Sequence, residues 1–394
     1  MSTGDAGREV CIVGVGHSTL SRASGQSVGA HALAACRSAM IDCGIAAKDV
    51  DGISGVYSTD LATVGPGYVS EGLGLGDITY CSTATPPSAN TLVNAYHAIA
   101  SGAIDVCLCY HAKYRWDVTS REATGDPFRR SPPMTFDPNF SQALAGPLPG
   151  ILGIAAYMQR HMWEFGSKRE HFGMIAVNNR THARSNPRAV FRRPMTIEDY
   201  LQAPMIYEPF SMFDMDAPID GGQAVVLCSL ARAKDLKQRP IKIMAAASAM
   251  TGQTDMLFQP FDQHLGSGLL MKRLWAKSGL QIQDIDLMNI YDGFTIITMD
   301  WLEAVIGERG VGPDLLKDSW DSESQTLRFF GRIPMSTHGG NLSEGRVQGM
   351  GHVLEAVEQL RGDSTRQIIS DGRFALVTNG FNPFIAGLIL GVLE

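Results

Sequence analysis

Hydrophobic and polar positions alternate along the chain in an order of strand and helix that occurs twice. An apolar run at residues 10–15 predicts a buried strand, and the pattern over residues 27–42 predicts a helix. The same order returns at residues 240–245 and 266–277. Each predicted helix is followed by a glycine, which suits a left-handed C-cap. The chain therefore contains an internal repeat.

The second part of each repeat also matches. Residues 94–102 predict a helix before the apolar strand at 106–110, and residues 355–362 predict one before the strand at 374–378. Strands that alternate with helices of this length imply crossover connections and largely parallel, buried sheets. We expect an α/β protein made of two duplicated βαβαβ-type halves.

A long segment between the repeats has a different character. Residues 113–213 are richer in Pro, Arg, Met and aromatic residues and show less alternation. A span of this length and irregularity is usually functional, for example a lid or a substrate-binding insertion. We therefore expect an N-terminal half from residues 1–112 and 214–236, an insertion at 113–213, and a C-terminal half at 237–394.

Charge and composition exclude several classes of function. The 394 residues carry a formal net charge of -7 without a basic block, which argues against binding to nucleic acid or to an anionic membrane. Neither a signal-peptide pattern nor a transmembrane-length apolar stretch is present, so we expect a cytoplasmic protein.

Two kinds of ligand site are disfavoured by the motifs. Gly14-Val15-Gly16 lacks the third glycine of a dinucleotide fingerprint, so a nucleotide site is not expected there. The histidines have no metal-ligand spacing, so no metal site is expected.

The cysteines form no CxxC pair, and an odd number in a cytosolic chain indicates reduced thiols. Their placement on predicted strands and helices favours a role in core filling. The seven positions are Cys11, Cys36, Cys43, Cys81, Cys107, Cys109 and Cys228.

The strongest candidate site lies in the C-terminal half. Tyr291 and Asp292, in the sequence YDGF, follow a predicted strand at 287–290. They therefore stand at the strand's carboxyl end, where open α/β sheets place their sites. The sequence STHGGNL, with His338, Gly339 and Gly340, predicts a glycine turn whose free amides can stabilise an oxyanion. The two motifs together predict one site.

With these motifs, the chain resembles the thiolase superfamily, and most closely its SCP2-thiolase or lipid-transfer-protein group. The resemblance rests on the duplicated halves, the insertion, YDGF and STHGG. Three further stretches carry it: HARSNP at 182–187, MTIEDY at 195–200 and DGG at 220–222. It extends over essentially the whole chain and implies a thiolase-like fold.

The chain departs from thiolases at the three positions that Claisen chemistry needs. The nucleophilic cysteine would align with Thr85, and Cys81 lies about four residues too early. The histidine of the Gly-His-Pro turn is replaced by Arg346, and the second cysteine by Thr378. An arginine stays protonated and cannot act as the base that activates a nucleophile such as Thr85 or Ser88. Thiolase activity is therefore disfavoured.

The resemblance points to a different reaction. Relatives that lack the cysteine act as aldolases on steroid side chains. They cleave a 17-hydroxy acyl-CoA to a 17-ketosteroid and propionyl-CoA, and they pair with a DUF35 partner of OB fold. The resemblance therefore implies a retro-aldol lyase with coenzyme A as part of the substrate and no covalently bound cofactor. It also implies a homodimer that becomes a heterotetramer with its partner.

The roles of individual residues follow from the same resemblance. Tyr291 is expected to act as the base or proton relay, held by Asp292, and His338 to orient the thioester. Arg346 stands where related aldolases carry a second tyrosine, and is expected to hold the thioester or a substrate carboxylate. Expected ligands of the oxyanion and of the CoA phosphates are Gly339, Gly340, Arg192 and Arg193, with Arg129 and Arg130 as the alternative arginines.

Two other functions stay open from the sequence. One is a thiolase-like acyltransferase that uses Thr85, Ser88 or Cys81 as a non-standard nucleophile. The other is a non-catalytic subunit that binds acyl-CoA or lipid. The intact YDGF and STHGG motifs favour an enzyme over a scaffold.

Overall fold

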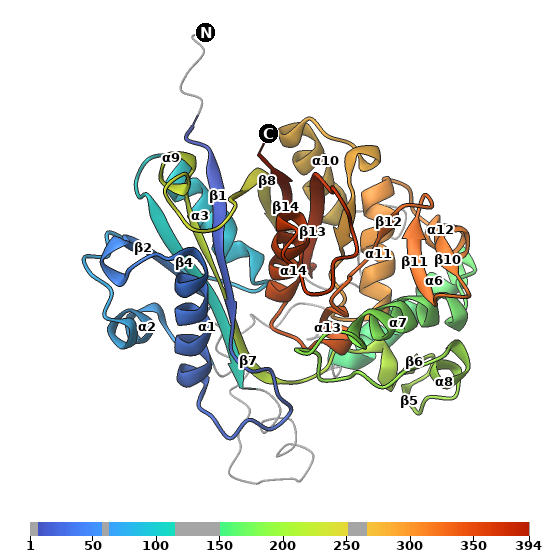
Figure 1. Ribbon diagram of the computed structural model, residues 1–394. Helices are drawn as coiled ribbons and strands as arrows, with labels where there is room; N and C mark the ends of the chain where they lie inside the picture. The colour runs from blue at the N-terminus through green and yellow to red at the C-terminus, as the bar shows by residue number, and fades with distance from the viewer. Residues whose placement is uncertain (1–6, 57–62, 115–149, 251–265, 394) are drawn as a thin grey trace.

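The computed structural model describes residues 7–56, 63–114, 150–250 and 266–393 (Figure 1). The described residues form one nine-stranded sheet with the order β3-β2-β4-β7-β1-β8-β14-β13-β9. Its strands are β1 (Val10–His17), β2 (Gly52–Val56), β3 (Tyr80–Ala84), β4 (Val106–Tyr114), β7 (Asp220–Ser229), β8 (Ile241–Met250), β9 (Leu287–Asn289), β13 (Phe374–Phe381) and β14 (Phe384–Val392).

The helices of the two halves pack on this sheet or on one another. They are α1 (Val28–Cys43), α2 (Pro66–Leu73), α3 (Ala89–Ala100), α9 (Leu230–Ala233), α10 (Gly266–Ser278), α11 (Thr295–Ile306), α12 (Gly312–Ser319), α13 (Gly340–Ser343) and α14 (Met350–Arg361). A small sheet in the C-terminal half contains β10 (Trp320–Asp321), β11 (Thr326–Phe329) and β12 (Ile333–Pro334).

The strand order confirms the predicted duplication. Counted inward from its two edges, the sheet reads β3, β2, β4, β7, β1 on one side and β9, β13, β14, β8 on the other. Counted outward from the centre, β1 corresponds to β8, β7 to β14, β4 to β13 and β2 to β9. An isolated bridge between Met288 and Met335 occupies the position in the second half that β3 has in the first. The two halves meet where Cys11 and Ile12 pair with Lys242 and Ile241.

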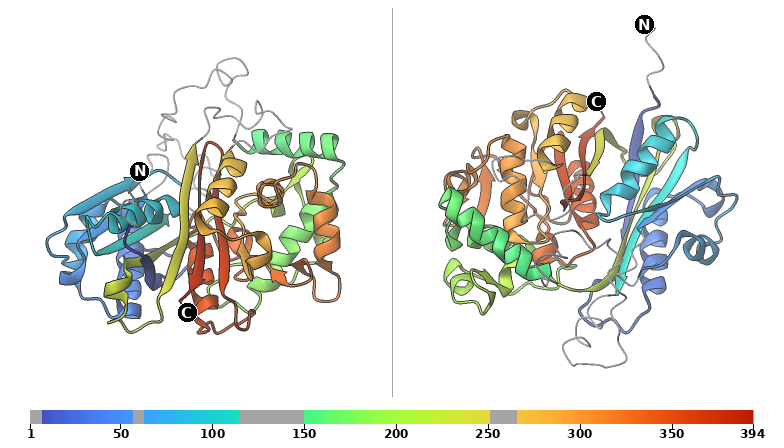
Figure 2. Two further views of the ribbon diagram at one scale, coloured as in Figure 1. Left: turned by 90° about the horizontal axis from the view of Figure 1, so that it is seen from above. Right: turned by 180° about the vertical axis from the view of Figure 1, so that it is seen from behind.

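Both faces of the sheet are buried, and three hydrophobic cores result. Cys11 and Val13 of β1 point into the core beneath α1, whereas Val10 and Ile12 point into the central core with α3 and α14. A third core lies between the C-terminal strands, α10, α11 and the insertion. The views in Figure 2 place the described helices of the insertion beside the C-terminal half, away from α1. The chain is therefore layered, with α3 and α14 in the middle.

The expectation of a largely parallel sheet is wrong. Only β2–β3, β2–β4 and β13–β9 pair in parallel within the described sheet, and the other pairs are antiparallel. The crossover units make their own strands parallel, as predicted. However, β14 follows β13 through a tight turn, and β7 returns from the insertion beside β4, so both join in the opposite direction.

The insertion is more regular than its composition indicated. Its described part contains α6 (Gly150–Phe165), α7 (Arg169–Ala183), α8 (Ile197–Leu201), β5 (Met205–Tyr207) and β6 (Phe210–Ser211). Phe172 and Ile175 of α7 are buried in the third core, so tertiary packing supports a helix whose own amphipathic pattern is weak. Arg129 and Arg130 lie outside the described residues.

Six cysteines are buried, which agrees with a role in packing, but Cys81 is exposed on the edge strand β3. The core-filling prediction is therefore wrong for Cys81. Burial raises the pKa of Cys11 and of Cys228 to about 12, so these thiols stay protonated at neutral pH. No described helix is long and apolar enough to cross a membrane.

Candidate active site

Tyr291 lies just after β9, as the sequence predicted, with one residue between them, and its side chain is buried with 1% of its surface exposed. Its backbone N–H donates to Oγ1 of Thr378 over 3.0 Å. A Cβ atom on Gly293 would lie 2.9 Å from the Tyr291 ring and 3.2 Å from its hydroxyl. The glycine of YDGF therefore leaves space for the ring of the tyrosine two residues before it.

Arg346 lies beside Tyr291, so the structure brings these two predicted residues together. Its guanidinium donates a hydrogen bond to the tyrosine hydroxyl and pairs with Asp216, with Nη1 at 2.6 Å from Oδ2. Burial opposes the charge of Arg346. The Asp216 carboxylate and the Tyr291 hydroxyl outweigh burial and hold the pKa of the guanidinium above its ordinary value. Arg346, whose side chain is 13% exposed, is thus a largely buried, permanent cation next to a phenol.

Asp216 is a site residue that no sequence pattern indicates. It belongs to a short connection that ties the two motifs: its N–H donates to the carbonyl of Gly293 over 3.1 Å. The next residue, Ala217, donates to the carbonyl of Asn341 and accepts from the N–H of Arg346. No motif marks Asp216, because only the fold brings this connection between YDGF and the loop after STHGG.

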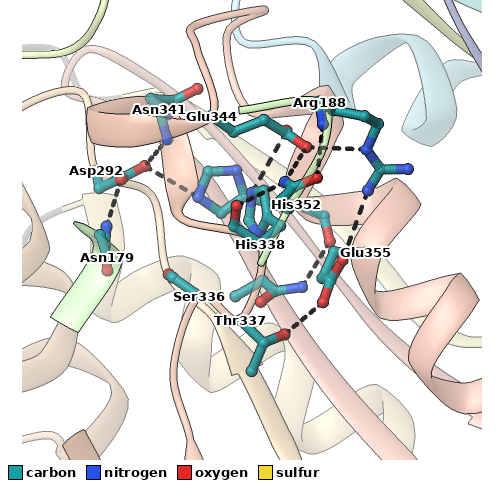
Figure 3. A network of polar contacts seen from close by, with 12 residues as sticks. Asn179, Arg188, Asp292, Ser336, Thr337, His338, Asn341, Glu344, His352 and Glu355 are labelled. Carbon is teal, nitrogen blue, oxygen red and sulfur yellow. Dashed lines mark hydrogen bonds and ion pairs between the residues drawn. The ribbon is translucent and has the colours of Figure 1, made fainter. Parts of the chain in front are cut away.

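Asp292 serves the fold in a way that the sequence did not predict (Figure 3). Its carboxylate accepts hydrogen bonds from the backbone N–H groups of Asn341 and Leu342 at 2.8 and 3.1 Å. It also accepts from Nδ2 of Asn179 at 2.6 Å, and Nε2 of His352 lies 3.1 Å from its Oδ1. Asp292 therefore anchors the start of α13 to β9, which fixes the glycine turn beside Tyr291.

The glycine turn has the backbone that its sequence predicted. Gly339 and Gly340 have φ values of 101° and 61°, and a Cβ on Gly340 would lie 2.0 Å from Oδ2 of Asp292. The amides of Asn341 and Leu342 donate to Asp292, and that of Gly339 donates to Ser336. These three amides thus hold the turn itself, and oxyanion binding by the turn stays a prediction.

His338 is enclosed in the same network. Its ring makes an edge contact with that of His352 at 4.8 Å between centroids, and its Nε2 lies 4.0 Å from Oε2 of Glu344. Among the described residues neither ring nitrogen of His338 has a hydrogen-bond partner. Burial and the nearby His352 hold the pKa of His338 well below its ordinary value, so the imidazole is neutral at pH 7.

Behind the histidines lies a buried ionic cluster. Arg188 donates to Glu344 at 3.1 Å and to both oxygens of Glu358. Arg366 donates to Glu355 at 2.7 Å, and Glu355 also accepts from the hydroxyl of Thr337. Figure 3 shows this cluster reaching the STHGG motif from α14. It fixes the motif from the side opposite Asp292.

Of the two residues at the thiolase nucleophile position, one is exposed and the other is buried beside a histidine. Thr85 is exposed. Ser88, at the start of α3, is buried, and its hydroxyl donates to the carbonyl of Val347 at 2.8 Å and lies 2.7 Å from Nδ1 of His111. Ser88 thereby joins α3 to the loop that carries Arg346.

Arg192 and Arg193 are exposed. The residue before them, Phe191, donates its N–H to the carbonyl of Ser343, so the pair lies near the loop that carries Arg346. Phosphate binding by these arginines stays a prediction. The described residues contain no cluster of three or more His, Cys, Asp or Glu side chains suited to a metal ion.

Comparison with known proteins places these features in a family. Residues 271–383 match the family model "Thiolase C-terminal domain-like". The chain is 32% identical to the 17-hydroxy-3-oxo-4-pregnene-20-carboxyl-CoA lyase of Mycobacterium tuberculosis, over 97% of this chain and 99% of that protein. It is 33% identical to the steroid side-chain-cleaving aldolase of Thermomonospora curvata, over 96% and 97% of the two chains.

Solved structures show the same fold. The structure titled Ltp2-ChsH2(DUF35) aldolase matches with a TM-score of 0.84 and 32% identity over 98% of both chains. Human mitochondrial 3-ketoacyl-CoA thiolase matches with a TM-score of 0.68 over 98% of this chain and 99% of that one. Its identity to this chain is 14%, which shows a shared fold alone.

Proposed function

Because the chain belongs to the thiolase-like superfamily and to its SCP2-thiolase branch, we propose that it is a carbon–carbon lyase. Its proposed substrate is a β-hydroxyacyl-CoA of the steroid side-chain type. The proposed reaction is a retro-aldol cleavage that releases a 17-ketosteroid and propionyl-CoA.

In this reaction Tyr291 acts as the base. Its oxygen takes the proton of the substrate's 17-hydroxyl, the bond between that carbon and the α-carbon breaks, and a ketone forms. The electron pair of the broken bond passes to the α-carbon as the enolate of the acyl-CoA. Protonation of that carbon completes propionyl-CoA. A tyrosine titrates near pH 10, so the reaction needs a cation that stabilises the phenolate.

The observation that carries the proposal is the pair of Tyr291 and Arg346 in a site without a thiolate. The guanidinium contacts the phenol directly and is fixed by a buried carboxylate. Thr85 and Thr378 stand at the two thiolase cysteine positions, and Cys81 is exposed on an edge strand. This combination supports proton transfer rather than acyl transfer.

The developing enolate places its charge on the thioester oxygen, where preorganised donors have their largest effect. His338, neutral and buried in the STHGG turn, is the proposed donor to this oxygen. We propose that Arg192 and Arg193 meet the CoA phosphates from the adjoining exposed segment. Coenzyme A enters as part of the substrate.

The proposed assembly is a homodimer that binds a DUF35 protein. Its support is the related aldolase structure, whose title names a DUF35 component. Co-purification of the chain with a small OB-fold protein from its native host tests this assembly. A monomer that binds no such protein would contradict it.

The test of activity uses the chain together with its DUF35 partner and 17-hydroxy-3-oxo-4-pregnene-20-carboxyl-CoA. Chromatography with mass detection should find the 17-ketosteroid and propionyl-CoA in equal amounts. Tyr291→Phe keeps the ring and removes the hydroxyl, and should lower kcat at least about a hundredfold, the usual contribution of a general base. Tyr157→Phe, which also removes a buried hydroxyl, is the matched control and should keep turnover.

Near-normal turnover of Tyr291→Phe would contradict the role of the tyrosine. If the wild-type complex forms no ketone, the lyase proposal itself is wrong. Release of free CoA without a ketone would instead indicate acyl transfer or hydrolysis.

A further inference from the structure

We propose that Asp216 is a positioning residue that holds the Arg346 guanidinium against the Tyr291 hydroxyl, so that Asp216, Arg346 and Tyr291 act as one unit. This inference rests on the proposed function, in which Tyr291 is the base. It assigns a role in the site to the ion pair of Asp216 and Arg346.

The contacts define a chain of three side chains. Asp216 has 2% of its surface exposed, and its Oδ2 lies 2.6 Å from Nη1 of Arg346. The same guanidinium donates to the hydroxyl of Tyr291. An arginine side chain is long and has many rotamers, and an ion pair with a fixed carboxylate selects one of them.

Asp216 is itself held on both sides. Its N–H donates to the carbonyl of Gly293, two residues after Tyr291, over 3.1 Å. The N–H of Arg346 donates to the carbonyl of Ala217, the residue after Asp216. The backbone that carries each member of the unit is therefore tied to the next, which keeps the three side chains in register.

Burial makes the pairing consequential. A buried guanidinium without an anion would carry a large desolvation cost and would turn toward water. With Asp216 in place, the cation stays beside the phenol, where it favours the phenolate over the neutral hydroxyl. Asp216 therefore acts on the tyrosine through Arg346 and not by contact with the substrate.

Other charged groups surround the unit but do not replace its members. The ring of His352 on α14 lies near that of Tyr291, tilted by 33° with 6.2 Å between the centroids. Asp292, the next residue, accepts from Asn179 and from the two amides of α13. From β4, His111 lies within electrostatic range of Arg346, with Lys113 nearby. None of these residues changes in the variants below, so their effect on Tyr291 is constant.

The experiment measures the titration of Tyr291 directly, without substrate. Tyrosine labelled with ¹³C at ring carbon ζ is incorporated into the full chain, and the Tyr291 resonance is identified by its loss in Tyr291→Phe. Removal of the cation in Arg346→Gln should raise the Tyr291 pKa by about one unit or more. Asp216→Ala should do the same, since the arginine is no longer held.

The double variant decides whether Asp216 acts through Arg346. If it does, Asp216→Ala combined with Arg346→Gln shifts the pKa and lowers kcat no more than Arg346→Gln alone. Asp214→Asn is the matched control. Asp214 is also fully buried, but its partners are Tyr200, Ser211 and Thr295. It should leave the Tyr291 titration unchanged.

Three results would overturn the inference. The first is an unchanged Tyr291 pKa in Asp216→Ala. The second is a lower Tyr291 pKa in that variant, which means that Arg346 stays in place without Asp216. The third is full additivity of the effects of Asp216→Ala and Arg346→Gln in the double variant. Asp216→Asn, which keeps the side-chain shape, is read in the same way if the alanine variant does not fold. If the variants shift the Tyr291 pKa as expected but the wild-type complex shows no lyase turnover, the unit of three side chains stands and only the proposed function is rejected.

Discussion

Replacement of Asp292 by Asn tests whether this residue anchors the glycine turn. The carboxylate accepts from three donors, the amides of Asn341 and Leu342 and the side chain of Asn179. Its Oδ1 also lies 3.1 Å from Nε2 of His352, which is equally close to the carbonyl of Ile290. An asparagine has a single acceptor oxygen and places an NH₂ group where the other carboxylate oxygen stood. If the NH₂ group replaces Oδ1, the amide of Asn341 loses its acceptor; if it replaces Oδ2, the amide of Leu342 and the side chain of Asn179 lose theirs.

The magnitude follows from these losses. A buried donor left without an acceptor costs about 1 to 3 kcal/mol, so the loss of one or two acceptors in Asp292→Asn should destabilise the fold by about 1 to 6 kcal/mol. Urea unfolding followed by circular dichroism measures this as a lower midpoint at an unchanged slope. The control is Asp314→Asn, whose side chain is 83% exposed and faces a single lysine, and its midpoint should not move.

Activity adds a second readout. An anchor affects turnover through the position of the turn, so Asp292→Asn assayed well below its unfolding midpoint should lose less kcat than Tyr291→Phe. Equal midpoints for Asp292→Asn and Asp314→Asn would refute the anchoring role. A loss of kcat as large as that of Tyr291→Phe, with normal stability, would restore Asp292 as a direct acid or base.

Three further predictions concern pH, backbone and thiols. Burial alone would raise the pKa of Glu355, but its buried cationic neighbours lower it. The stabilisation that ionised Glu355 gives the fold is therefore complete above its unfolded pKa of about 4.3, and it is lost as pH falls through the lower pKa of the folded state. Glu355→Gln should flatten the decrease of the urea midpoint at acid pH. An unchanged decrease would count against this role of Glu355. Gly349→Ala, with φ of 84° and a Cβ 1.8 Å from Nδ2 of Asn379, should lower the midpoint more than Gly331→Ala, with φ of 69° and open space; equal shifts would be inconsistent with the clash. Iodoacetamide should alkylate the exposed Cys81, detected by mass, without loss of turnover, and inactivation by that single modification would exclude a cysteine-independent reaction.

The sequence alone was sufficient for the fold class and the duplicated halves. Both follow from local signals: apolar runs, helical periodicity and a glycine after each helix. The direction of β7 and β14 was not predictable in this way, because it depends on how the chain returns to the sheet. The helices of the insertion were missed since Phe172 and its neighbours pack against distant strands rather than along a clear stripe.

In the candidate site too, residues with a local sequence signal were predicted and residues placed only by long-range packing were not. Tyr291 was found because the YDGF motif carries it, and Arg346 because the resemblance to thiolases aligns it with their histidine; the structure places the two side chains in contact. Asp216 and Asn179 carry no motif, and their roles arise from pairings across long stretches of chain. The alternative uses of Asp292, as partner of Tyr291 or as anchor of α13, look identical in the sequence and differ only in where its oxygens point.

The position of β7 also limits how early the chain can fold while it is being synthesised on the ribosome. In the order β4-β7-β1, the first strand of the chain has no neighbour in its own half until residues 220–229 exist. The N-terminal half therefore cannot close as translation proceeds, and β1 and β4 must wait, with apolar faces exposed, while the whole insertion is made. A nascent chain halted before residue 220 should thus recruit holding chaperones, whereas one halted after residue 229 should resist protease across the N-terminal half.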